Sequence, residues 1–195
     1  MLGALLHPLI LWTGLALAVF SVFFFRDPDR TIMAEPGQIF APADGKVLSI
    51  DEVEDTEYMG GRCKRIGIFL SILDVHINRS PIAGKIDLVR YRPGKFSAAY
   101  SIEASTSNEN NIIGIEGDVK IMVKQIAGLV ARRIVCWCKP HQTVRAGERI
   151  GMIRFGSRTE LYLPLECEIF VSVGQKVKGG LSLVAICHEP LKKKA

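Results

Sequence analysis

The chain has 195 residues, of which 48% are hydrophobic and 23% are charged. That length allows one compact domain with a short appendage and excludes two large domains. Lys and Arg outnumber Asp and Glu by 25 to 20, so the net charge is +5 and the pI is about 9.0. This excess is too small to indicate a nucleic-acid partner, and we expect none.

The first stretch, Leu2 to Phe25, carries no formal charge. As a helix, its roughly 24 residues would be about 36 Å long, against a hydrocarbon core of about 30 Å. His7 and Pro8 interrupt the first third, so a membrane-spanning helix and a half-inserted anchor both remain open. A basic start and a small-residue cleavage site are missing, which argues against a cleaved signal peptide.

We therefore expect residues 1–30 to form a hydrophobic membrane anchor with a connector, and residues 31–195 to form the folded domain. If the apolar stretch spans the membrane, Arg26 and Arg30, which follow it, predict that the domain lies on the cytoplasmic side of the cell membrane. Further basic groups are Arg132 with Arg133 and the run 192–194. An anionic membrane surface fits such groups, because each basic residue contributes about 1 kcal/mol there. Solvated surface charge is the alternative.

The cysteines form an odd set without a C-x-x-C pair or a paired histidine spacing, so we expect no metal site. We interpret all of them as reduced thiols, in agreement with a cytoplasmic domain. They are Cys63, Cys136, Cys138, Cys167 and Cys187. Cys136 and Cys138 would share one face of a strand and are expected to pack in the core.

The rest of the chain consists of short apolar runs separated by Gly, Pro, Asp and Asn, a pattern typical of strands. The expected strands are 46–50, 65–70, 85–91, 111–115, 119–126, 149–153, 160–163 and 181–186. Outside the first stretch, we expect a helix only around Gly128 to Val135. Similar turns around Gly147 and Gly174 are typical of lipoyl-like hairpins. The predicted fold is a mainly β sandwich with an N-terminal hydrophobic helix.

Common hydrolase, kinase and zinc-protease signatures are absent from the sequence. A Gly-Ser pair, Gly156 and Ser157, lies between two expected strands, and such a pair by itself is typical of a turn. Among the histidines, His76 is the best candidate for a base, because the other three lie in the apolar stretch or in polar loops. A buried histidine with satisfied hydrogen bonds is the alternative for His76.

Five segments resemble, in the same order, parts of the phosphatidylserine decarboxylase proenzymes. They are 24–28, 41–46, 71–76, 127–133 and 151–157. The last segment ends in Phe-Gly-Ser and is followed by Arg158, as in the processing site of the short branch of that family. The resemblance extends over nearly the whole chain, which argues against a chance match.

The resemblance implies self-cleavage between Gly156 and Ser157. The Ser157 hydroxyl attacks the Gly156 carbonyl, elimination cuts the chain, and the loss of ammonia leaves a pyruvoyl cofactor at residue 157. The chains 1–156 and 157–195 then stay associated. The pyruvoyl carbonyl forms a Schiff base with phosphatidylserine and accepts the electrons released with carbon dioxide, which yields phosphatidylethanolamine. No metal is needed for this reaction.

By the same resemblance, His76 is the base that takes the proton from Ser157, and Asp44 orients His76. A turn role in Ala-Asp-Gly is the alternative for Asp44. The long branch of the family has a second histidine at the place of Arg79, so the function of that histidine cannot be carried over. Our hypothesis is that Arg79 binds the lipid phosphate or the serine carboxylate, because both fit a guanidinium.

Two alternative functions remain open. The first is the same decarboxylation of an archaeal ether lipid that carries serine. The second is a membrane-anchored carrier or adaptor built on a lipoyl-like sandwich, without catalysis. A carrier would present a lysine in a tight hairpin between methionines and an adaptor would add long heptad helices, and neither pattern occurs in the sequence.

Overall fold

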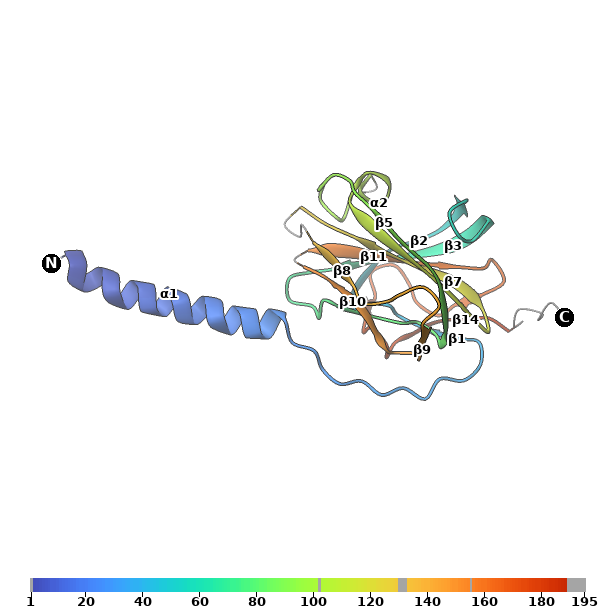
Figure 1. The fold of residues 1–195 in the computed structure, drawn as a ribbon, viewed down its shortest axis with the longest axis horizontal. Helices are drawn as coiled ribbons and strands as arrows, with labels where there is room; N and C mark the ends of the chain where they lie inside the picture. The colour runs from blue at the N-terminus through green and yellow to red at the C-terminus, as the bar shows by residue number, and fades with distance from the viewer. Residues whose placement is uncertain (1, 102, 130–132, 155, 189–195) are drawn as a thin grey trace.

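The structure is a computed structural model that describes residues 2–101, 103–129, 133–154 and 156–188. Phe155 of the expected processing site, Arg132 and the basic run 192–194 lie outside the described residues. The chain forms a long N-terminal helix that extends away from a β domain, and an extended connector that leads from the helix to the domain (Figure 1).

Helix α1 spans Leu2–Phe24 and continues through Pro8, so the expected interruption at His7 and Pro8 does not occur. Its large apolar side chains between Leu9 and Val22 are exposed, except that of Phe20, which is partly buried. The helix ends where the Arg26 side chain donates to the Phe23 carbonyl oxygen at 2.9 Å. Within the described part of the chain, no helix combines the length and the hydropathy needed to cross a membrane.

The largest sheet has eight antiparallel strands and curls into a half-barrel. In spatial order the strands are β13 (Lys176–Val177), β2 (Gly45–Asp55), β3 (Gly61–Leu70), β11 (Ser157–Leu163), β7 (Lys120–Ile126), β6 (Asn110–Gly117), β5 (Gly84–Arg92) and β9 (Thr143–Val144). Alternating apolar side chains such as Ile66, Ile68 and Leu161 point from this sheet into the main core. Strand β11 lies in the interior of the sheet, and all seven of its residues are buried.

Two three-stranded sheets and a short helix complete the domain. One sheet has the order β1 (Gln38–Phe40), β14 (Leu183–Ile186) and β12 (Glu168–Ile169), and the other has the order β4 (Ile77–Arg79), β10 (Arg149–Ile153) and β8 (Ile134–Cys136). Helix α2 spans Ala104–Ser107. The mainly β fold is therefore confirmed, and each of the eight expected strands overlaps an observed one. The two glycine turns also occur, with left-handed φ angles of 78° at Gly147 and 92° at Gly174.

The expected helix around Gly128 to Val135 is wrong for the described residues of this segment, and residues 130–132 lie outside them. Ile134–Cys136 is strand β8, which pairs with β10 through Val135 and Met152. The apolar spacing of this segment resembles a helix, but two β-branched residues and a partner strand favour the extended form. The partner lies about fifteen residues away in the sequence, so the local pattern did not reveal it.

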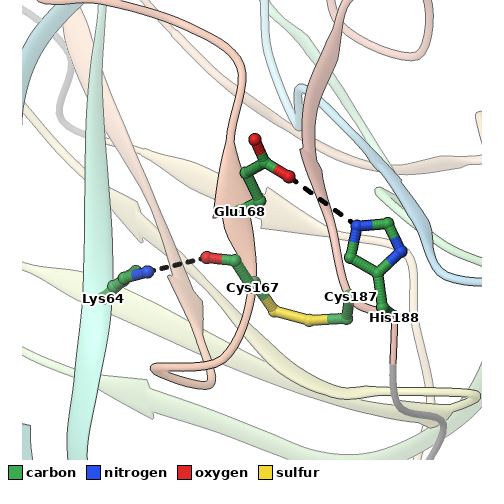
Figure 2. The surroundings of a disulfide bond; sticks show 5 residues. All are labelled: Lys64, Cys167, Glu168, Cys187 and His188. Carbon is green, nitrogen blue, oxygen red and sulfur yellow. Dashed lines mark hydrogen bonds and ion pairs between the residues drawn. A yellow bond between two sulfur atoms is a disulfide. The ribbon is translucent and has the colours of Figure 1, made fainter.

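Another correction concerns the cysteines, because Cys167 and Cys187 form a disulfide (Figure 2). The register of the small sheet explains this bond: Glu168 pairs with Ile186, so the two cysteines that flank this pair lie opposite each other. The Lys64 ammonium group donates to the Cys167 carbonyl oxygen at 2.7 Å (Figure 2). The interpretation of all five cysteines as reduced thiols therefore fails for this pair.

Core packing of the other two neighbouring cysteines is confirmed. Cys138 belongs to the main hydrophobic core, and Cys136 packs against it partly buried. Both remain free thiols, together with Cys63.

Candidate active site

The expected processing site lies at the start of the interior strand β11. Ser157 is its first residue, is fully buried, and pairs with Leu70 at the end of β3. Gly156 has a φ of +53°, in the left-handed region that favours glycine. A side chain at position 128 would overlap the Gly156 carbonyl oxygen, so Gly128 is what lets the chain approach this peptide bond. The peptide bond between Gly156 and Ser157 is thus held at a fixed place by a strand and a glycine contact.

His76 lies in the loop between β3 and β4, and only 1% of its surface is exposed. This loop follows Leu70, the partner of Ser157, and precedes Ile77, the partner of Met152. The Ile153 amide also donates to the His76 carbonyl oxygen at 3.3 Å. Strand pairing therefore places the His76 loop beside the segment that leads into Ser157.

The imidazole of His76 has a defined tautomer. Its Nδ1 lies 2.9 Å from the carbonyl oxygen of Asp74, and a carbonyl oxygen can only accept, so Nδ1 carries the proton. Burial lowers the pKa of His76 below its ordinary value of 6.5. At neutral pH the ring is therefore uncharged, with a free lone pair on Nε2.

Several buried polar atoms of this region have no hydrogen-bond partner among the described residues, including the Nε atoms of Arg79, Arg154 and Arg158. Two further ones are Nε2 of His76 and the hydroxyl oxygen of Ser157. Nearly all buried polar atoms in folded proteins are paired, so unpaired ones need an explanation. The last two atoms are complementary, because Nε2 can accept a proton and the hydroxyl can donate one. Their chemistry is that of a base and a nucleophile.

Asp44 is 8% exposed and directs its carboxylate to Arg30. The two Nη atoms of Arg30 lie 2.5 and 2.9 Å from the two carboxylate oxygens, and the Gly179 amide donates to the same carboxylate at 2.8 Å. The described contacts of Asp44 do not include His76. Its negative charge nevertheless acts on that imidazole and raises its pKa, against the larger effect of burial. The group that orients His76 directly is the Asp74 carbonyl.

Arg79, at the end of β4, is 2% exposed. One Nη atom donates to the Gly147 carbonyl oxygen at 3.0 Å. The other donates to the Asp27 carboxylate at 3.0 Å and to the Pro28 carbonyl oxygen at 2.7 Å. The guanidinium therefore fastens the connector to the domain, and its substrate-binding role stays a prediction.

A buried amide network beside the site escaped the sequence analysis. Asn78 donates to the Thr159 hydroxyl at 3.1 Å and accepts from the Gln125 amide at 2.8 Å, and Asn111 donates to Gln125 at 2.9 Å. The network joins β4 to β11, β7 and β6, so it fixes the strand that follows the His76 loop against the large sheet. The available signal was an amide side chain inside an otherwise apolar strand.

Comparisons with known proteins identify the family of this chain. The family model of phosphatidylserine decarboxylase matches residues 17–185. The phosphatidylserine decarboxylase proenzyme of Carboxydothermus hydrogenoformans is 47% identical over 188 residues, which cover 94% of this chain and 87% of that protein. The proenzyme of Desulfotalea psychrophila is 44% identical over 167 residues, which cover 85% and 78% of the two chains. The chain therefore belongs to the phosphatidylserine decarboxylase family.

Proposed function

We propose that this protein is a carboxy-lyase that converts phosphatidylserine to phosphatidylethanolamine after it has cut itself between Gly156 and Ser157. The observation that carries the proposal is the pair of unpaired buried atoms, Nε2 of His76 and the Ser157 hydroxyl. The names of the relatives, decarboxylase proenzymes, support both the reaction and the cut. Membership of this family argues against a carrier or adaptor without catalysis.

Maturation begins when Nε2 of His76 takes the proton of the Ser157 hydroxyl. The oxygen attacks the Gly156 carbonyl carbon, and the imidazolium returns the proton to the Ser157 nitrogen as the peptide C–N bond breaks. An ester now joins the two residues. Loss of the Ser157 Cα proton expels the Gly156 carboxylate and leaves dehydroalanine at position 157. Water then hydrolyses the imine form of this residue, which releases its nitrogen as ammonia and leaves a ketone.

The position of Ser157 fits a pyruvoyl group. The residue is buried at the end of a strand, its side-chain oxygen has no partner among the described residues, and a side chain on Gly156 would meet nothing within 4 Å. The pyruvoyl carbonyl supplies an electron sink for decarboxylation of an amine substrate. His76, fixed through Asp74, takes up at Nε2 a proton released by the substrate ammonium group and gives it to the lipid carbon after carbon dioxide has left. Asp44 contributes through its negative charge, which favours the protonated imidazole.

The two chains stay together after the cut. The smaller chain, 157–195, begins with β11, which pairs with β3 on one side and with β7 on the other. Both neighbours belong to the larger chain, 1–156. Their register includes seven residue pairs with β3 and five with β7, and the inward-facing side chains of β11 lie in the main core.

Attachment to the cell membrane, with the domain on the cytoplasmic side, is part of the proposal. It is supported by the exposed apolar side chains of α1 and by Ile72 and Leu73, which are 50% and 64% exposed in the His76 loop. Such side chains gain about 25 cal/mol per Å² when they leave water. The cytoplasmic side rests on Arg26 and Arg30 alone. The Cys167–Cys187 disulfide argues against it, because such bonds are rare in reducing compartments.

The test compares wild type with Ser157→Ala and with Ser172→Ala, a matched change of an exposed serine. We expect wild type and Ser172→Ala to give two pieces by denaturing electrophoresis and intact mass, and to release carbon dioxide from phosphatidylserine vesicles. Ser157→Ala should stay one full-length chain without activity. Two pieces from Ser157→Ala would show ordinary proteolysis and end the proposal.

A further inference from the structure

The end of α1 and the connector after it contact three expected site residues, His76, Arg79 and Asp44. Phe24 packs on His76, as described below. Asp27 pairs with Arg79, and Arg30 pairs with Asp44. The segment from Phe24 to Arg30 thus lies on the site itself, although the sequence analysis predicted only a connector between the anchor and the domain.

Phe24 differs sharply from the other residues at the end of α1. It is 1% exposed, whereas Phe23 and Phe25 are 41% and 43% exposed. The Phe24 ring lies against the His76 ring, with 4.2 Å between the centroids and 38° between the planes. Phe25 meets Phe24 edge to face at 5.0 Å. The last residue of the helix is therefore buried against the imidazole.

A second contact holds the His76 loop to the helix end. The Arg26 guanidinium donates to the Leu73 carbonyl oxygen at 2.5 Å and lies over the Phe23 ring at 4.0 Å. Leu73 belongs to the six-residue loop that carries His76. The helix end thus contacts this loop at two points, one apolar and one polar.

We propose that Phe24 is a positioning residue for His76, which fixes the imidazole ring and excludes water from it, so that the end of the anchor completes the catalytic site. This inference rests on the proposed roles of His76 and Ser157 and goes beyond them. Asp74 fixes only one edge of the imidazole, through Nδ1, and leaves its faces free. Phe24 packs against the ring itself, so the two contacts together restrict the direction of Nε2.

The effect of Phe24 on the protonation of His76 has a definite sign. Burial is the largest influence on this imidazole and lowers its pKa. The charged groups that act on it are Asp74 and Asp44, which raise the pKa, and Arg26, which lowers it. Removal of the Phe24 ring admits water without removing any of these charges, so the pKa of His76 should rise towards its ordinary value.

The first test follows self-cleavage during in vitro translation in detergent micelles, across a range of pH, so that membrane binding does not limit the result. The variants are Phe24→Ala and Phe24→Leu, with Phe170→Ala as a control for a phenylalanine that is 48% exposed. We expect Phe24→Ala to cleave about ten- to a hundredfold more slowly at neutral pH, because a misplaced base loses this much. The acid limb of the pH–rate profile of Phe24→Ala should move to higher pH. Phe24→Leu should lie between Phe24→Ala and wild type, and Phe170→Ala should match wild type.

The second test separates positioning from mere stability and does not need cleavage. His76 is titrated by NMR in the uncut Ser157→Ala protein, with and without Phe24→Leu or Phe24→Ala. An upward shift of the His76 titration in the Phe24 variants supports the inference, even if wild type proves unable to cleave and the proposed function fails. An unchanged titration together with an unchanged acid limb overturns the inference, whatever the rate. If Phe24→Ala does not fold, Phe24→Leu alone decides.

Discussion

The two ends of strand β4 carry buried polar groups of different chemistry. Before its first residue lies His76, whose Nε2 has no partner among the described residues, as is also true of the nearby Ser157 hydroxyl. At its last residue lies Arg79, equally buried, whose two Nη atoms donate to Asp27, Pro28 and Gly147, while its Nε has no partner among the described residues. An unpaired buried polar group costs about 1 to 3 kcal/mol. Neither burial nor a missing partner therefore marks a reactive residue by itself: a neutral imidazole can accept a proton, whereas a guanidinium cannot.

The largest expected effect is at the end of β4 that carries His76. His76→Ala removes the base, so self-cleavage should slow by about 10²- to 10⁴-fold. The time course of the two pieces on denaturing gels measures this change. His188→Ala, which alters a histidine whose side chain is 72% exposed, is the control and should cleave normally. Rapid maturation of His76→Ala would remove the distinction between the two ends.

At the other end of β4, where Arg79 lies, we expect a loss of stability. Arg79→Ala deletes three hydrogen bonds of a buried cation and should lower the free energy of unfolding by about 3 kcal/mol. Urea denaturation of the uncut Ser157→Ala protein measures this loss. Arg62→Ala breaks a surface pair and should change stability by no more than about 0.5 kcal/mol. Unchanged stability with a raised KM for lipid would instead support the hypothesis that Arg79 binds the headgroup.

A smaller effect is expected at Gly128. The Cβ of Gly128→Ala would overlap the Gly156 carbonyl oxygen and shift the peptide bond away from the Ser157 hydroxyl. We expect cleavage to slow by about tenfold or more, because attack depends on alignment. Gly60→Ala is a suitable control, since its left-handed φ costs stability while its Cβ would meet nothing within 4 Å. Equal cleavage rates for the two variants would contradict the role of Gly128.

The smallest effect is the pH dependence of stability. The unfolded chain binds a proton on His76 near pH 6.5, whereas burial keeps the folded pKa lower. Between these two values the unfolded state holds more protons, so stability is complete above about 6.5 and falls as the pH drops towards the folded pKa. Urea denaturation of the Ser157→Ala protein at several pH values measures the slope. His76→Phe in the same background should flatten it, and an equal slope in both proteins would contradict the buried neutral imidazole.

The sequence predicted what depends on local pattern and on resemblance. The strand positions, the Gly156–Ser157 pair and His76 as base candidate followed from apolar runs, turn residues and family motifs. The partners of these groups did not, because they depend on long-range register. Arg30 meets Asp44 across fourteen residues, and the Cys167–Cys187 bond follows from pairing of β12 with β14. The sequence analysis included Phe24 only as part of a family motif. Its burial could not be predicted, because that burial depends on where the end of α1 meets the His76 loop.

The pairing of Ser157 with Leu70 has a consequence for the life of the protein. These two residues come from opposite halves of the sequence, so they meet only after the interior of the large sheet has assembled. Under the proposed mechanism, the chain therefore breaks its own backbone only once it is nearly native, and a misassembled molecule stays uncut and inactive. Each pair of fragments would then show that one molecule had reached its folded form.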